Sequence, residues 1–255
     1  MKRITLLLAV LTVTFSFAQR SPAIAPSSIS QFQQMISTVD NFNNNIKNNT
    51  NYFIKNGQKI ENTNVIGSMY YDDEFKKGEV IDKETGQVIS VYLRYRIYDD
   101  TFEAKKSPQE EETLIMERNP KYDIVIDGTK FTFINQLPIF INKANNGYLV
   151  VLNENDDAQV LKRISQKFTP GQKSNTPMSS DKKPRLKNEE NYFISVNNEL
   201  FSIEAHKRRA ADAFPDHNKE LEKYIKNNKL KFRRSNEEED LITLTKYYNE
   251  VTENS

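Results

Sequence analysis

Residues 87–99, "QVISVYLRYRIYD", carry the clearest fold signal in the chain. Every second position holds an apolar or aromatic side chain: Val91, Leu93, Tyr95 and Ile97. The positions between them hold tyrosine and arginine: Tyr92, Arg94, Arg96 and Tyr98. Because successive side chains of a β-strand point to opposite faces, the two sets lie on opposite faces. The stretch therefore predicts a strand with its first set in a core.

Strand-like runs of the same kind extend from about residue 51 to residue 168, and the connections between them are short. Asn56-Gly57 and Asp127-Gly128 are two-residue hairpin signals, and Asn197-Asn198 follows the same pattern further on. No helical period lies between the strands, which favours an antiparallel arrangement over parallel strands joined by helices. We expect a strongly curved sheet or a small barrel, since open sheet edges promote aggregation.

Helical patterns lie on either side of the strand region. Apolar residues recur every three or four positions over 29–46, which predicts an amphipathic helix. The chain after residue 204 predicts two to three helices, the last of them opening at Ser235 and Glu238 with a capping-box pattern. The fold class predicted is therefore mainly β (α+β), with an N-terminal amphipathic helix and a helical C-terminal part.

The predicted organisation has four parts. Residues 1–19 read as a signal peptide, because Lys2 and Arg3 precede an apolar run that ends near Ala18. Residues 20–50 form a leader with the amphipathic helix and an Asn-rich linker, and 51–204 form the antiparallel β domain. Within that domain 169–190 is expected to be a long loop, since it has three prolines and no apolar period. Residues 205–255 form a helical tail packed on the β domain.

Composition excludes several classes of chemistry. The chain has no cysteine, so it cannot carry a lipoprotein anchor, a disulfide or a thiol nucleophile. It has two histidines, without the spacing of a zinc site, and we predict neither a metal nor a cofactor. Its 36 Lys+Arg nearly balance 35 Asp+Glu, which is not the charge of a nucleic-acid binder.

The strand predicted over residues 87–99 also carries the main candidate site. Tyrosines and arginines on one sheet face could stack on a sugar or bind an anion. The candidates for binding a ligand or partner are Tyr92, Arg94, Arg96 and Tyr98, together with Tyr70 and Tyr71. The alternative is a solvated sheet face stabilised by cross-strand Tyr–Arg and Arg–carboxylate pairs, which we favour.

Asp72, Asp73 and Glu74 form a weaker, acidic candidate. Such a group could hold a hard cation or supply an acid–base pair. Adjacent residues of a strand point to opposite faces, so the carboxylates would converge only in a turn. A polar loop is the simpler interpretation, and we assign no catalytic residue.

Two stretches together resemble a family of uncharacterised exported proteins from Bacteroidetes. The first pattern comprises Gly67, Ser68, Tyr70, Phe75, Gly78, Leu93, Arg94, Tyr95, Tyr98 and Asp99. The second is the C-terminal stretch that begins "FPDHNKELEKYIKNN" at residue 214. The resemblance implies export and architecture and carries no catalytic signature.

The expected function is that of an exported, non-catalytic binding or assembly protein of the bacterial cell envelope, in the periplasm or associated with the envelope. Its partner would be another envelope protein or a small ligand, with no nucleic acid and no membrane span after signal cleavage. Two alternatives stay open. One is a hydrolase that uses exposed carboxylates, and the other is a carrier of a lipid or other apolar ligand inside the sheet.

Overall fold

The computed structural model describes residues 52–55, 58–61, 65–111, 113–116, 118–154, 157–174, 180–203, 209–233 and 235–253. The predicted signal peptide, the amphipathic helix over 29–46 and the Asn56-Gly57 turn lie outside these residues. Two short strands, β1 (Tyr52–Lys55) and β2 (Gln58–Glu61), pair with each other as a separate antiparallel ribbon.

The main sheet has ten antiparallel strands in the described part of the chain. They are β3 (Lys76–Asp82), β4 (Val88–Arg96), β5 (Thr101–Lys105), β6 (Leu114–Met116), β7 (Tyr122–Ile126), β8 (Thr129–Ile134), β9 (Gly147–Val151), β10 (Ala158–Thr169), β11 (Arg185–Val196) and β12 (Glu199–Ile203). Their spatial order is β12-β11-β10-β9-β8-β7-β3-β4-β5-β6, so the sheet is curved but not closed. The mainly β prediction is confirmed, and the curved sheet applies rather than the barrel.

Two of the predicted hairpin turns form as expected. Asp127 and Gly128 have φ angles of 48° and 79° and join β7 to β8. Asn197 and Asn198, with φ angles of 50° and 65°, join β11 to β12. Positive φ at both central residues gives a turn whose twist matches that of the flanking strands, which explains why Asn, Asp and Gly occupy these positions.

Two apolar layers hold the sheet together. The concave side is filled by an aromatic cluster that includes Tyr95, Phe102, Phe131 and Tyr148, with ring centroids 4.7–6.4 Å apart. On the other side of β8–β11, the loop 135–146 places Leu137 against Leu149, Leu161 and Phe193. The sheet is thus buried on both faces over its central strands.

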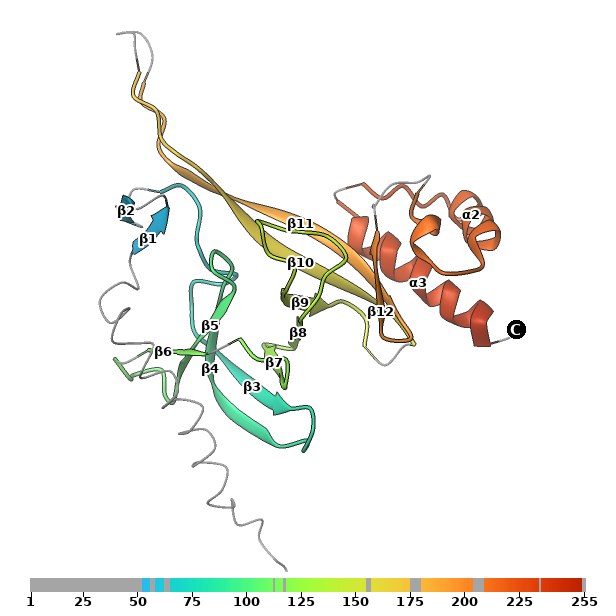
Figure 1. Ribbon diagram of the computed structural model, residues 1–255, viewed down its shortest axis with the longest axis horizontal. Coiled ribbons are helices and arrows are strands. Elements are labelled where there is room, and N and C mark those ends of the chain that lie inside the picture. The colour runs from blue at the N-terminus through green and yellow to red at the C-terminus, as the bar shows by residue number, and fades with distance from the viewer. Residues whose placement is uncertain are drawn as a thin grey trace, which may run out of the picture.

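Helices cover one end of β10–β12, as Figure 1 shows. They are the 3₁₀ turn η2 (Ala211–Ala213), α2 (Asn218–Asn227) and α3 (Glu237–Glu253). Asn249 fixes α3 to the sheet, because its side chain accepts from the backbone N–H of Ala158 (2.9 Å) and donates to the carbonyl of Ala158 (3.1 Å). None of the helices in the described residues has the length and hydrophobicity of a membrane span.

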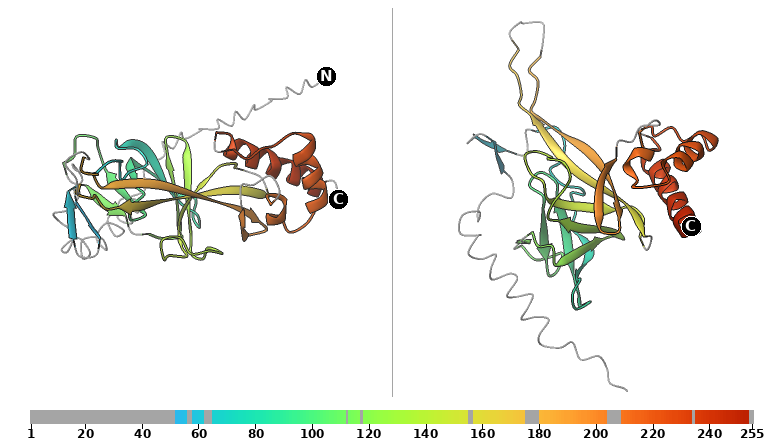
Figure 2. Two further views of the ribbon diagram at one scale, coloured as in Figure 1. Left: turned by 90° about the horizontal axis from the view of Figure 1, so that it is seen from above. Right: turned by 45° about the vertical axis from the view of Figure 1, so that its right-hand side comes forward.

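At the opposite end, the β10–β11 hairpin continues beyond the body of the protein (Figures 1 and 2). Strand β11 begins at Arg185, inside the stretch 169–190 that was expected to be a loop. The sequence did not predict this strand because its first half is almost entirely polar: Leu186 is its one apolar residue before Tyr192. The connection between β10 and β11 is correspondingly shorter than expected.

Candidate functional site

The predicted two-faced strand is β4. Val91, Leu93, Tyr95 and Ile97 are buried, whereas Tyr92, Arg94, Arg96 and Tyr98 are half-buried. The alternation is therefore confirmed. The second set does not face open water, however, because the segment 65–75 lies across part of it. Tyr70 forms an antiparallel bridge with Arg96, which places Tyr70 on the same face as the arginines.

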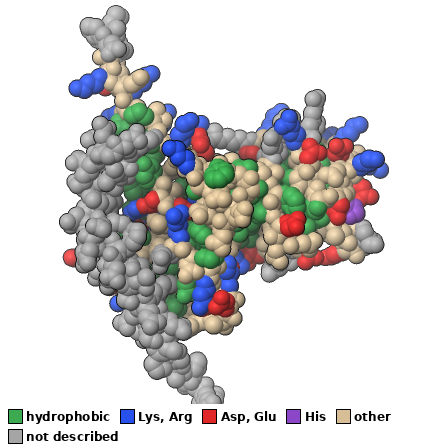
Figure 3. All heavy atoms as spheres, viewed as in Figure 1, with side chains coloured by type: hydrophobic (Ala, Val, Ile, Leu, Met, Phe, Trp, Pro, Cys, Tyr) green, Lys and Arg blue, Asp and Glu red, His purple; other side chains and the backbone are tan. Residues whose placement is uncertain are grey.

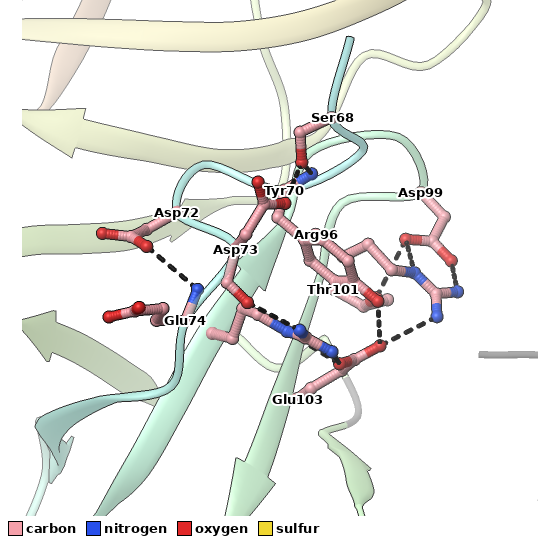
Figure 4. A network of polar contacts seen from close by, with 10 residues as sticks. Ser68, Tyr70, Asp72, Asp73, Glu74, Arg96, Asp99, Thr101 and Glu103 are labelled. Carbon is pink, nitrogen blue, oxygen red and sulfur yellow. Dashed lines mark hydrogen bonds and ion pairs between the residues drawn. The ribbon is translucent and has the colours of Figure 1, made fainter. Parts of the chain in front are cut away.

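The arginines of this face bind a carboxylate that sequence analysis did not identify. Glu103 of β5 is 0% exposed and lies directly opposite Arg94 in the β4–β5 register. Arg94 donates to its Oε2 from Nη2 (2.5 Å) and Nε (3.2 Å). Arg96 donates to Oε1 from Nη1 (3.1 Å), and the Tyr70 hydroxyl donates to the same oxygen (3.3 Å). Figure 4 shows this arrangement, which we call the Glu103 network.

The aromatic residues of the candidate site complete the network. The Arg94 guanidinium lies over the Tyr70 ring (3.7 Å to the centroid) and the Phe75 ring (4.4 Å), a favourable cation–π geometry. Burial, with the nearby Glu103 carboxylate, raises the pKa of Tyr70 to about 12. The Tyr70 hydroxyl therefore stays protonated at neutral pH and serves as a hydrogen-bond donor.

Arg96 has a second carboxylate partner at the turn that follows β4. It donates from both Nε and Nη2 to the two oxygens of Asp99. Burial opposes the charged form of Arg96, yet the bonds to Asp99 and the charge of Glu103 raise its pKa overall. Two arginines thus meet two carboxylates, so the charges of this face are largely satisfied within the protein.

The acidic candidates lie in a loop, where the carboxylates of Asp72 and Glu74 both contact Lys76 Nζ, at 3.6 and 3.5 Å. Asp72 also accepts from the backbone N–H of Glu74 (2.9 Å). Asp73 accepts from the Ser68 hydroxyl, while its backbone carbonyl accepts from Arg94 (2.8 Å). These local contacts agree with the polar-loop interpretation. In the described residues, no group of three or more His, Asp or Glu side chains is placed to hold a metal ion.

The remaining tyrosine candidates differ in accessibility. Tyr71 is 45% exposed and rests its ring edge-on against Phe131, with centroids 5.7 Å apart. Tyr92 is half-buried between Lys77 and Lys105, its paired residues on β3 and β5. Tyr98 packs against the small core cluster around Met69. Of the tyrosine candidates, Tyr71 is thus the exposed one, whereas Tyr92 and Tyr98 are half-buried.

A second polar cluster joins distant parts of the chain. Arg163 of β10 donates from Nη1 to the Asp100 carboxylate (2.6 Å), the Tyr95 hydroxyl (2.9 Å) and the Tyr148 carbonyl (3.0 Å). The Tyr95 hydroxyl in turn donates to Asp100 (2.7 Å). We call these four residues the Asp100 cluster. All four are buried, which indicates a structural role in holding β10 against the β4–β5 turn.

The third feature is the projecting hairpin, which we call the arm and define as residues 167–174 and 180–187. The β10–β11 ladder runs unbroken to Thr169 and Arg185, and pairing resumes between Gln172 and Lys182, with N–O distances of 2.9 and 2.8 Å. Phe168 and Leu186 pack against Met69 and Tyr70 in a small core cluster, which fixes the base of the arm.

Segment 65–71 links this arm to the Glu103 network. Ile66 donates to the Pro184 carbonyl and accepts from the N–H of Leu186, both at 2.9 Å. Four residues later along the chain, the Tyr70 hydroxyl donates a hydrogen bond to Glu103. One short segment therefore joins the arm to β4 and β5.

No protein-family model, curated protein or solved structure matches the chain.

Proposed function

We propose that the protein is an exported, non-catalytic binding or assembly protein of the bacterial envelope, and that the arm is its contact element. The observation that carries this proposal is the arm itself. It is a two-stranded ribbon, paired up to Thr169–Arg185 and again at Gln172–Lys182, that extends beyond the body, and its buried apolar residues lie at its base. Surface that does not contribute to the core is available for a partner.

Segment 65–71 supports this assignment because it braces the arm against the rest of the sheet. A contact element that is already ordered before binding loses less conformational entropy when the complex forms. The backbone bonds of Ile66 and the packing of Phe168 and Leu186 give the arm that order. The predicted signal peptide and the resemblance to exported Bacteroidetes proteins support a contact outside the cytoplasm.

The two other candidate functions receive less support from the geometry. Asp72 and Asp73 are engaged with Lys76 and Ser68 and do not form an acid–base pair. The concave side of the sheet, where a carrier would hold an apolar ligand, is filled by Tyr95, Phe102, Phe131 and Tyr148. We therefore propose binding on the surface rather than inside the sheet.

Site-specific photo-crosslinking tests this proposal. A photoreactive amino acid would replace exposed Lys182 of the arm in the full-length chain, and the control would replace exposed Lys223 of α2. We expect crosslinked products in intact cells from the arm position that are absent at the control position. Identical products from both positions would contradict a contact role for the arm.

A further inference from the structure

The arm carries charge of almost one sign. Its basic residues, all exposed, are Lys167, Lys173, Lys182, Lys183, Arg185 and Lys187. Asp181 is the one acidic residue within the described part of the arm, and it accepts from the backbone N–H of Ser174. Figure 3 shows Lys and Arg side chains gathered on the projecting hairpin. The chain as a whole has a formal net charge of only +1, so positive charge is concentrated here.

The placement of these charges works against the stability of the hairpin. Lys167 and Lys187 are direct cross-strand partners. Like charges at directly opposed positions of an antiparallel pair are destabilising. None of the six basic side chains forms an ion pair with another described residue. Charged residues, lysine in particular, protect open sheet edges, but that role does not require two lysines at directly opposed positions. The concentration of one sign therefore indicates an anionic binding partner.

A second, independent feature lies at the base of the arm. Phe140, in loop 135–146, is 76% exposed and is the most exposed of the large apolar side chains described. Its neighbours Ile139 and Ile141 are partly buried against the sheet, and their packing holds the loop in place. Asn142 donates to the Gln166 carbonyl (3.2 Å), the residue before Lys167. Lys143, also exposed, follows in the same loop.

An exposed aromatic side chain next to basic residues is the combination that peripheral membrane proteins use. The aromatic ring inserts at the level of the lipid headgroups, and the cations are attracted by anionic lipids. Five of the six basic residues of the arm are lysines. Lysine is a strongly hydrated point charge, which suits diffuse attraction to a charged surface rather than bidentate recognition of one group.

We propose that the arm and the Phe140 loop together bind the surface of a bilayer containing anionic phospholipids. This inference rests on the proposed function and names the partner of the arm. Each basic residue near an anionic membrane contributes about a five-fold gain in partitioning. The attraction of the arm is screened by salt, whereas the contribution of Phe140 is not.

Vesicle sedimentation with the mature protein tests the inference. The probes are phosphatidylcholine vesicles alone and the same vesicles with roughly a third phosphatidylglycerol, at about 0.1 M and about 1 M salt. We expect binding to the anionic vesicles at the lower salt and far weaker binding to the neutral ones. Equal binding to both vesicles, or none to either, would overturn the proposal.

Two variants separate the two contributions. Replacing Lys167, Arg185 and Lys187 with Gln should lower partitioning about a hundred-fold at low salt and little at high salt. Phe140→Ser should lower it by about ten-fold at both salt concentrations. A matched control replaces the exposed Lys219, Lys223 and Lys226 of α2 with Gln. An equal loss in that control would show that net charge alone acts, and would contradict a role for the arm.

The outcomes of the photo-crosslinking and vesicle experiments can be told apart. All variants are first compared by thermal unfolding, so that a loss of fold is not mistaken for a loss of binding. If the protein did not bind vesicles but gave a specific protein crosslink from Lys182, the lipid inference would be overturned and the proposed function would stand. Failure of both would contradict the proposed function as well.

Discussion

Glu103 Oε2 lies 2.5 Å from Nη2 of Arg94, at directly paired positions of β5 and β4, and the Glu103 side chain is fully buried. This pair determines how the rest of the candidate site is interpreted. Arg94, a candidate for ligand binding, instead forms a cross-strand Arg–carboxylate pair, the kind of contact favoured from the sequence, although this one is buried rather than solvated. The face that Arg94 shares with Tyr70 and Arg96 is therefore a stabilised interior rather than an open platform.

Removing the charge of Glu103 should destabilise the protein strongly. Glu103→Gln leaves Arg94 without a carboxylate and Arg96 with Asp99 alone, and breaking a buried ion pair costs about 3 kcal/mol or more. Denaturant unfolding measures the change in the free energy of unfolding. Glu79→Gln, at an exposed position of β3, is the control and should change it by less than about 0.5 kcal/mol. Equal effects of the two substitutions would contradict the network.

Because Arg94 belongs to this network, replacing it is a poor test of ligand binding. Arg94→Ala removes three hydrogen bonds and the stacking on Tyr70 and Phe75, so it should lower the unfolding temperature. Tyr92→Ala alone, at a half-buried position, should leave the unfolding temperature within a few degrees of the parent. If the Arg94 variant unfolded at the parent temperature, the structural role assigned here would be wrong.

Alkaline pH should weaken the fold through Tyr70. Its pKa is about 12 in the folded protein, against about 10 for an unfolded chain. Between these values the unfolded state has already lost the proton that the folded state retains, so the free energy of unfolding falls as pH rises. Unfolding curves from about pH 9 to about pH 11 would record the decline. Tyr70→Phe should show a flatter decline, and parallel curves would contradict the assignment.

Gly147 is required by the Asp100 cluster. Its φ angle is 151°, and an added Cβ would lie 2.6 Å from Asp100 Oδ2 and 2.7 Å from Arg163 Cζ. Gly147→Ala should therefore cost about 3 kcal/mol or more, since it combines backbone strain with displacement of a buried ion pair. Gly86→Ala is the matched control, because Gly86 also has a positive φ but nothing within 4 Å of its added Cβ. That control should lose only about 1 kcal/mol, measured by denaturant unfolding.

Asn249 should control how firmly α3 is held on the sheet. Asn249→Ala removes the two bonds to Ala158 and should cost about 1–2 kcal/mol, since it leaves the Ala158 N–H without this acceptor, while the Ala158 carbonyl keeps its bond from Asn153. Hydrogen exchange should accelerate in α3 and leave β3 and β4 unchanged. Uniform acceleration over the whole sheet would contradict a local effect and indicate a cooperative one.

Local patterns predicted the elements well. Alternation along 91–98 identified the two faces of β4, and Asp127-Gly128 identified a hairpin, because each signal depends only on neighbouring residues. Glu103 could not be paired with Arg94 in advance, since that contact depends on the register set by the turn 97–100. Arg163 and Asp100 meet only through the curvature of the whole sheet, over a separation of 63 residues.

The order of strands has a consequence for how the chain folds. Strands β3 to β6 pair in sequence, and so do β7 to β12, and in the described part of the chain the β3–β7 ladder is the one strand pairing that joins the two series. Each series consists of contacts between strands that are neighbours in sequence, which close quickly at little entropic cost. The joining of β7 to β3 spans a much longer separation and should be the late event, with the Asp100 cluster forming in the same step. A chain stalled before that event would display the unpaired edges of β3 and β7, which makes this junction the point at which misassembly between molecules would begin.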